Sequence, residues 1–172
     1  MSKEIEKLRI IDPKIKTTTI RHLRKEDSIT LEDFVDDWIK SNPETDQDCC
    51  VEWMFLNKLY NNLVGLFIGN TLVSVAAIKE TTYLDVPITY KEHAEIMFIG
   101  TKSEFQNQGY SKLLLSFILW KANFSSNGFV IETYDGATSS LCKKLSFKEI
   151  PGNKEKLEGE LTILFFTYPK DK

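Results

Sequence analysis

The sequence predicts an α/β protein whose elements follow the order β-α-α-β-β-β-α-β-α-β, with a further short strand at Lys148 to Ile150. Apolar runs bounded by turn residues alternate with stretches of helical periodicity. Hydrophobic residues make up 42% and charged residues 27%, which are ordinary values for a globular chain. A length of 172 residues suits one domain. We therefore expect residues 1–172 to form a single domain, with residues 1–15 as a flexible leader.

The first elements are a strand and two helices. Lys16 to Leu23 is a short β-branched run, which is typical of a strand. Thr30, with an acidic residue three positions later, resembles a helix start, and helical spacing continues to Ser41. A second helix is predicted from about Asp48 to Tyr60, with Asn61-Asn62 ending it.

Three strands follow. Leu63 to Ile68 and Leu72 to Glu80 are joined by Gly69-Asn70, a pair that can adopt the positive φ angles of a tight hairpin. Ala94 to Thr101 is a strongly apolar strand with one glutamate, and a polar loop follows from Lys102 to Gln108.

The C-terminal third begins with a helix from Gly109 to about Asn123. Its apolar residues occupy two stripes, so the helix must be covered on more than one side, as against a sheet. Phe129 to Tyr134 is predicted as a strand, Thr138 to Leu145 as a short helix and Leu161 to Tyr168 as the last strand.

Composition excludes several classes of protein. The N-terminal segment has neither the apolar core of a signal peptide nor a spanning segment, so we expect an intracellular protein, cytoplasmic or nuclear, without a membrane partner. Cys49, Cys50 and Cys142 show no metal-knuckle spacing, so no metal is expected. The net charge is -3 and no basic stripe is present, so direct nucleic-acid binding is not expected. We expect a monomer or a homodimer.

One motif carries chemistry: a polar loop after a buried strand runs into a long helix. A helix N-terminus offers unpaired amide donors and a positive dipole end, and glycine lets an anion come close. The alternative is an ordinary strand-to-helix turn. The motif comprises Gln106, Asn107, Gln108, Gly109, Tyr110 and Ser111.

This motif resembles the signature of the GNAT superfamily of N-acetyltransferases, Gln/Arg-x-x-Gly-x-Gly/Ala. Gln106 and Gly109 match it, and Ser111 replaces the last small residue. That serine could crowd a pyrophosphate or donate a hydrogen bond to it. The resemblance implies a GNAT fold: a central mixed, mostly antiparallel sheet of six to seven strands flanked by about four helices.

The resemblance looks closest to the histone-type lysine acetyltransferase branch. That branch has an Ala-Glu-Ile-x-Phe strand before the phosphate loop, which is matched by Ala94 to Phe98. Cys142 to Ile150 resembles its short helix and Gly-Phe turn, with Ser146 in place of glycine, and Leu157-Glu158-Gly159 also fits. The similarity covers roughly Leu63 to Pro169.

The resemblance implies transfer of an acetyl group from acetyl-CoA, the co-substrate, to an amine of a protein, a peptide or a small molecule. Glu95 matches the general base, and burial in an apolar strand should raise its pKa. Alternatively, Glu95 faces solvent or pairs with Lys91 or Lys102. His93 is a second candidate base, or merely a solvated loop histidine.

Further roles follow from the same resemblance. The backbone of Ile99, Gly100 and Thr101 would bind the pantetheine arm, the Ile99 amide would stabilise the oxyanion, and the phosphate contacts would extend to Lys112.

In many family members a tyrosine protonates the leaving thiolate. Here Cys142 occupies that slot, with Tyr134 as a weak substitute, and Cys142 could equally be a small packing residue. The departures from the family pattern at Ser111, Cys142 and Ser146 leave open a second function. The chain could be a catalytically weak acyl-CoA-binding module that acts through partners.

The first predicted helix carries an acidic face opposite its apolar stripe, formed by Glu32, Asp33, Asp36 and Asp37. In this family the first helices wall the acceptor groove, so the face could attract a basic peptide or a polyamine. It could also be an ordinary solvated face.

Overall fold

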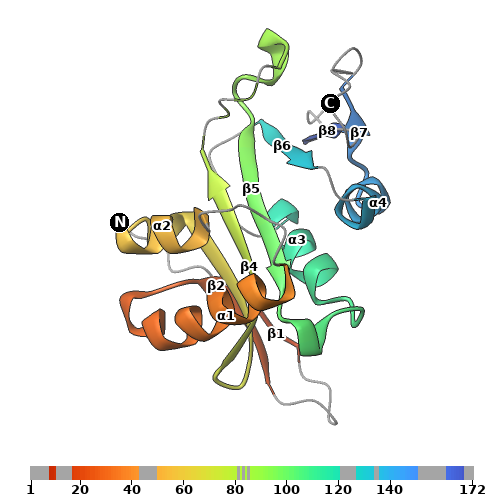
Figure 1. Cartoon of the computed structure of the whole chain (residues 1–172). Helices are drawn as coiled ribbons and strands as arrows, with labels where there is room; N and C mark the ends of the chain where they lie inside the picture. The colour runs from red at the N-terminus through yellow and green to blue at the C-terminus, as the bar shows by residue number, and fades with distance from the viewer. Residues whose placement is uncertain are drawn as a thin grey trace. The chain divides into compact units, whose positions relative to one another are not determined.

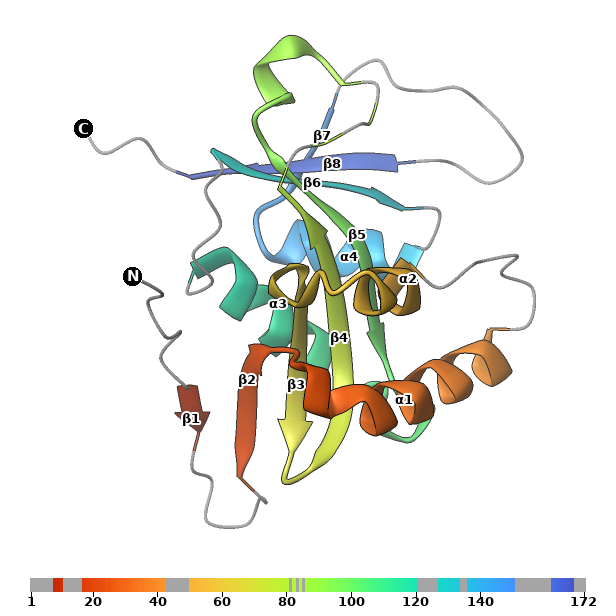
Figure 2. The same ribbon diagram turned by 90° about the vertical axis from the view of Figure 1, so that its left-hand side faces the viewer.

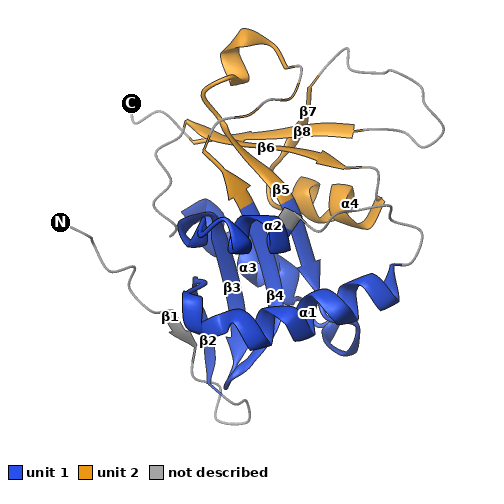
Figure 3. Ribbon diagram, turned by 60° about the vertical axis from the view of Figure 1, so that its left-hand side comes forward, with its two compact units in different colours: residues 1–77, 98–123 blue, residues 78–97, 124–172 orange. Residues whose placement is uncertain are grey.

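The computed structural model of the chain describes residues 8–10, 17–42, 50–80, 82, 84, 86–120, 127–133, 136–150 and 162–168. Within these ranges there are eight strands and four α-helices, and the elements after the first strand follow the expected order (Figure 1). The chain divides into two compact units, residues 1–77 with 98–123 and residues 78–97 with 124–172 (Figure 3). Strands β4 (Thr71–Lys79) and β5 (Ala94–Thr101) contribute residues to both.

Unit 1 contains an antiparallel arrangement of β1 (Leu8–Ile10), β2 (Thr18–His22), β3 (Leu63–Ile68) and the first part of β4. The hairpin between β3 and β4 turns at Gly69, whose φ of 59° confirms the predicted tight turn. Strand β1 falls within the predicted leader, and its three residues pair with β2.

The helices of unit 1 are α1 (Ser28–Ser41), α2 (Cys50–Leu56) and α3 (Tyr110–Trp120). In Figure 2, α1 and α2 lie on one side of β3 and β4, and α3 lies on the other. Both apolar stripes of α3 contribute buried side chains, namely Leu114, Leu115, Phe117, Ile118 and Leu119. A continuous core joins α1 and α2 to the strands, and its fully buried members include Leu23, Phe34, Val51, Leu63, Val75 and Ala77.

Helix α1 begins at Ser28, two residues before the predicted Thr30. Thr30 Oγ1 instead donates to the Asp27 carbonyl at 2.9 Å. The Asp27 carboxylate accepts two bonds of 2.7 Å from Arg21 and one of 2.7 Å from the Arg24 amide. Burial by itself raises the pKa of Asp27, but these bonds and the Arg21 charge outweigh it and hold that pKa below its ordinary value.

Unit 2 is built from the first part of β5, β6 (Gly128–Thr133), β7 (Lys148–Glu149) and β8 (Thr162–Thr167). Strands β5 and β6 run parallel, whereas β6–β8 and β7–β8 are antiparallel. The strand order is β1-β2-β3-β4-β5-β6-β8-β7, a mixed, mostly antiparallel sheet as predicted, with β1 as the additional strand.

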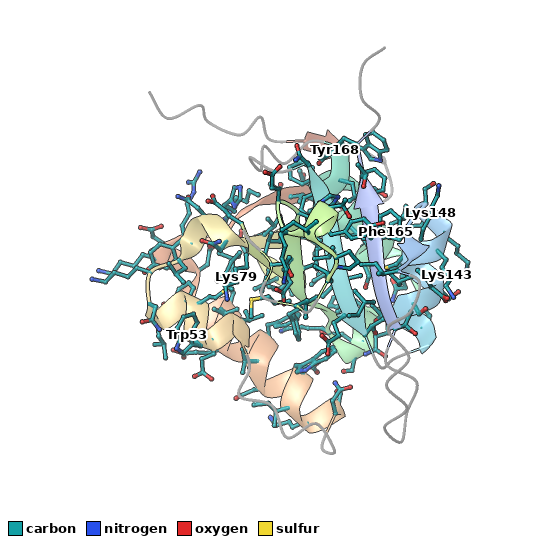
Figure 4. All side chains as sticks on the ribbon, turned by 90° about the horizontal axis from the view of Figure 1, so that it is seen from above. Trp53, Lys79, Lys143, Lys148, Phe165 and Tyr168 are labelled. Atoms are coloured by element: carbon teal, nitrogen blue, oxygen red, sulfur yellow. The ribbon has the colours of Figure 1, made fainter. Side chains whose placement is uncertain are left out.

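Helix α4 (Gly136–Lys144) ends in a two-bond cap. The Phe147 amide donates to the Cys142 carbonyl at 3.1 Å, and the Ser146 amide donates to the Lys143 carbonyl at 3.1 Å. Ser146 has a φ of 70°, the left-handed conformation that glycine adopts most easily. In Figure 4, Lys143 and Lys148 lie together at the outer edge of unit 2, near α4 and β7.

No helix in the described part of the chain combines the length and the apolar character needed to cross a lipid bilayer.

Candidate functional site

Two hydrogen bonds determine which edge of β5 its backbone groups face. Ser74 Oγ donates to the Gly100 carbonyl at 2.6 Å, and the Lys102 amide donates to a β4 carbonyl at 2.9 Å. Residues 100 and 102 therefore direct backbone groups toward β4. Because backbone groups of successive strand residues alternate between edges, the amides of Ile99 and Thr101 point away from β4. This is the orientation that an added ligand strand requires.

The turn after β5 presents an open backbone. Gly109 has a φ of 84°, and a Cβ built on it would meet no heavy atom within 4 Å. Asn107 also has a positive φ, of 59°, which asparagine tolerates better than most residues. The Gly109 carbonyl accepts from the Leu113 amide at 3.0 Å, so Gly109 caps α3. The first amides of α3 have no acceptor inside the helix and converge on this open space.

The loop's glutamine side chains bond to nearby backbone. Gln106 Nε2 donates to the Thr101 carbonyl at 3.4 Å, and Gln108 Nε2 donates to the Glu104 carbonyl at 3.1 Å. Tyr110 packs edge-to-face on Phe105 at 6.1 Å. These contacts hold the turn together. The Gln106 amide donates to the Ser103 carbonyl at 3.3 Å, whereas the backbone amides of residues 107–112 and the exposed Lys112 ammonium can meet an anion.

Ser111, the departure from the family signature, directs its side chain toward β5. Its Oγ lies 2.6 Å from Thr101 Oγ1, which in turn lies 3.0 Å from the buried Ser74 Oγ. Three hydroxyls from α3, β5 and β4 thus form a continuous chain beneath the turn.

The acidic face of α1 is not uniformly solvated. Both oxygens of Asp37 accept from Ser103, one from the backbone amide and one from the hydroxyl, each at 2.8 Å. Ser103 begins the 3₁₀ turn Ser103–Phe105, which leads into the loop from Gln106 to Ser111. Asp37 therefore ties α1 to the loop, whereas Glu32, Asp33 and Asp36 are exposed.

Glu95 lies on β5 and is half-buried. The buried Thr82 donates its hydroxyl to Glu95 Oε2 at 3.2 Å, and the same hydroxyl accepts from the Leu84 amide at 3.1 Å. Lys91, an expected ion-pair partner, donates instead to the Leu84 carbonyl at 2.7 Å. Glu95 is thus held by a neutral hydroxyl donor within unit 2.

His93 is not a solvated loop residue, because only 3% of its surface is exposed. Its Nε2 lies 3.0 Å from Thr167 Oγ1, and its ring packs against Tyr90 at 5.4 Å. Its Nδ1 is buried and has no hydrogen-bond partner among the described residues. Burial lowers the pKa of His93, although the nearby Glu92 charge opposes the shift. These contacts give His93 a packing role, so it is a poor candidate for the base.

Cys142 is fully buried on α4, at 0% exposure. Burial raises the pKa of its thiol to about 12. The thiol is therefore a core group without access to solvent. Tyr134, the suggested substitute, lies outside the described residues, as do Cys49 and Leu157-Glu158-Gly159.

No cluster of three or more His, Cys, Asp or Glu side chains suitable for a metal ion occurs among the described residues. Ser74 and Thr82 were not anticipated at the predicted site, and Asp37 was expected on the acidic face of the first helix but not as a partner of Ser103. Each acts through a partner distant in sequence, from 13 residues for Thr82 and Glu95 to 66 for Asp37 and Ser103. The apolar surroundings of Ser74 in β4 are the one local signal that could have indicated a bonded hydroxyl.

Sequence comparison finds no matching protein-family profile and no matching curated protein. Structure comparison finds a putative acetyltransferase, yncA, from Salmonella typhimurium with its cofactor acetyl-CoA, at 16% identity and a TM-score of 0.64, covering 90% of this chain and 96% of that one. A GNAT-family acetyltransferase from Streptococcus pneumoniae matches at 19% identity and a TM-score of 0.61, covering 88% and 99%.

A third match is diaminobutyrate acetyltransferase EctA from Paenibacillus lautus, in complex with L-2,4-diaminobutyric acid and coenzyme A. The two chains are 12% identical with a TM-score of 0.62, and the match covers 90% of this chain and 98% of that one. At such identities the likeness establishes the fold. The chain has the fold of the GNAT acetyltransferases.

Proposed function

We propose that the chain is an acetyl-CoA-dependent N-acetyltransferase that transfers the acetyl group directly to a primary amine. The observation that carries the proposal is Gly109, a positive-φ glycine in open space at the start of α3. It follows a strand whose Ile99 and Thr101 amides point away from β4. Coenzyme A or acetyl-CoA accompanies structural neighbours of the same fold.

The residues supply three functions to the reaction. The amides at the start of α3 would bind the diphosphate, together with Lys112. The Ile99 amide would donate to the thioester oxygen as negative charge develops there. Glu95, on the same strand, would accept the proton that the attacking amine loses. The new C–N bond forms as the C–S bond breaks, and coenzyme A leaves as a thiolate, which needs little help from an acid.

The acceptor we propose is a protein lysine or another protein amine, ahead of a small molecule. The support is the Ala94 to Phe98 pattern, which resembles the lysine acetyltransferase branch, and the exposed acidic residues Glu32, Asp33 and Asp36 on α1. Exposed carboxylates attract a basic peptide most strongly at low salt.

The second candidate is an acyl-CoA-binding module with little or no turnover. The burial of Cys142, which leaves the general-acid slot without an accessible proton, favours it. Both candidates bind coenzyme A, so only turnover separates them.

The test is an acceptor screen with the full chain and acetyl-CoA. Histone-tail peptides, protein N-termini, polyamines and aminoglycosides are scored by release of free CoA thiol and by the mass of one added acetyl group. An enzyme gives both signals, and Glu95→Gln lowers the rate by about a hundredfold or more while the affinity for CoA persists. A Glu95→Gln variant with wild-type rates across pH would remove Glu95 as the base. Binding of CoA without any acetylated product would favour the binding module.

A further inference from the structure

The hydroxyls of Ser74, Thr101 and Ser111 have a fixed proton order. The chain ends on the Gly100 carbonyl, which can only accept, so Ser74 must donate its single proton to it at 2.6 Å. Ser74 Oγ is then an acceptor for Thr101, at 3.0 Å. Thr101 has no second proton, so the 2.6 Å contact with Ser111 is made by the Ser111 proton. The carbonyl at one end therefore sets the direction of every bond.

This order commits the Ser111 proton to Thr101. A hydroxyl has one proton, so Ser111 presents only lone pairs to anything else that approaches it. Lone pairs repel a phosphate oxygen. Ser111 would thus contribute its backbone amide, and not its hydroxyl, to an anion at the start of α3.

The contact also fixes the first turn of the helix. Helix ends fray readily, and the amides of the first turn have no intrahelical bonds to hold them. Thr101 and Ser74 are both buried, at 6% and 0% exposure, so the hydroxyl chain is anchored in the interior of unit 1. A partly buried bond to β5 can hold the Ser111 amide near the other amides of the first turn.

We infer that Ser74, Thr101 and Ser111 form a relay of hydroxyl groups with a fixed proton order, which positions the start of α3 for binding a diphosphate. Thr101 and Ser74 are positioning residues. The Ser111 hydroxyl makes no direct contact with the phosphate. The inference rests on the proposed function. It also explains how serine replaces the small last residue of the family signature, since its hydroxyl is turned into the protein.

The test is a double-substitution cycle on the Ser111–Thr101 bond, read as the dissociation constant of CoA by calorimetry. Ser111→Ala and Thr101→Val each break that bond, and each should weaken CoA binding by about threefold to tenfold, the range of one net hydrogen bond. The double variant should bind no more weakly than either single variant, because both remove the same interaction. Thr101→Ser keeps the hydroxyl and should restore wild-type affinity.

A matched control and a second ligand separate positioning from general loosening of the fold. Thr18→Val makes the same change at a residue of unit 1 that is also buried, at 7% exposure, but lies outside the relay; it should leave the affinity for CoA unchanged. S-acetylpantetheine lacks the diphosphate, so its affinity should change less than twofold in Ser111→Ala. Equal losses for both ligands would overturn the inference.

Three further outcomes would contradict the relay. If Ser111→Ala weakens CoA binding but Thr101→Val does not, the Ser111 hydroxyl is a phosphate ligand. If the losses multiply in the double variant, the two residues act independently. If neither single variant differs from Thr18→Val, the relay positions nothing. Failure of the unaltered chain to bind CoA would overturn the proposed function itself, and this inference with it.

Discussion

Replacing Gly109 by tryptophan tests the open turn at the start of α3 directly. The structure separates the effect of this substitution on folding from its effect on CoA binding. A Cβ at this position meets nothing within 4 Å, so the first atom of a larger side chain enters open space without a clash. That same space is where an anion would approach the first amides of α3. We expect Gly109→Trp to fold and to lose CoA binding.

The magnitudes follow from two independent costs. A φ of 84° costs an L-residue about 1–2 kcal/mol of folding free energy. In a chain of this length, each 1 kcal/mol lowers Tm by about 2–4 °C. If the indole blocks two charge-assisted hydrogen bonds of about 1.5–3 kcal/mol each, binding loses at least about 3 kcal/mol. That loss raises the Kd for CoA more than about a hundredfold.

Gly69 provides the matched control. It also has a positive φ, of 59°, and open space around its Cβ, but it lies in the β3–β4 hairpin. Gly69→Trp should lower Tm to a similar extent and retain wild-type affinity, with thermal unfolding and calorimetry as the assays. Wild-type affinity in a folded Gly109→Trp would refute the assignment of the loop. Equal loss in both variants would trace the effect to the fold.

Ser146→Gly should raise the free energy of unfolding by about 1 kcal/mol, because glycine adopts the left-handed φ of 70° without strain; thermal unfolding would show it, and an unchanged Tm would contradict it. Burial holds the pKa of His93 below 6.5, so the unfolded chain takes up the proton first, and stability falls as the pH drops from about 6.5 toward the folded-state pKa, by at most about 1.4 kcal/mol per pH unit. His93→Gln should reduce that dependence of Tm on pH, and the part that persists belongs to His22, whose pKa is also lowered by burial. Asp37→Ala should destabilise the chain by about 0.5–1.5 kcal/mol because it removes two solvent-exposed hydrogen bonds, whereas Asp36→Ala should stay within about 0.5 kcal/mol of wild type. Asp36→Ala should instead raise the Michaelis constant for basic acceptors at low salt, and unchanged kinetics would leave that residue without a substrate role.

Local pattern was sufficient for the elements with strong periodicity. The predicted strand Ala94 to Thr101 has the same bounds as β5, because a continuous apolar run between polar turns has few alternatives. The Gly69 hairpin followed from turn chemistry that acts within four residues. The open turn at Gly109 was likewise indicated by the residue type that a positive φ favours.

Long-range contacts account for what local pattern missed. Helix α1 starts before Thr30 because Asp27 is held by Arg21 on β2, which no helix-start signal contains. His93 is buried through contact with Thr167, 74 residues away. The relay was hidden for the same reason, since Ser74 and Thr101 are 27 residues apart and neither looks unusual alone.

Helix α1 is tied to the candidate site at two successive residues. The Asp37 carboxylate accepts hydrogen bonds from the amide and the hydroxyl of Ser103. The centroid of the Trp38 ring lies 4.9 Å from that of the Phe98 ring. The Trp38 ring is also close to β5, because a Cβ added to Gly100 would lie 2.9 Å from it. Successive helix residues point about 100° apart, so α1 cannot turn to favour one contact without breaking the other. An acceptor that drew on the acidic face of this helix and shifted it would therefore disturb β5 and the loop together. Any such effect must be reciprocal, with bound CoA changing acceptor affinity by the same factor.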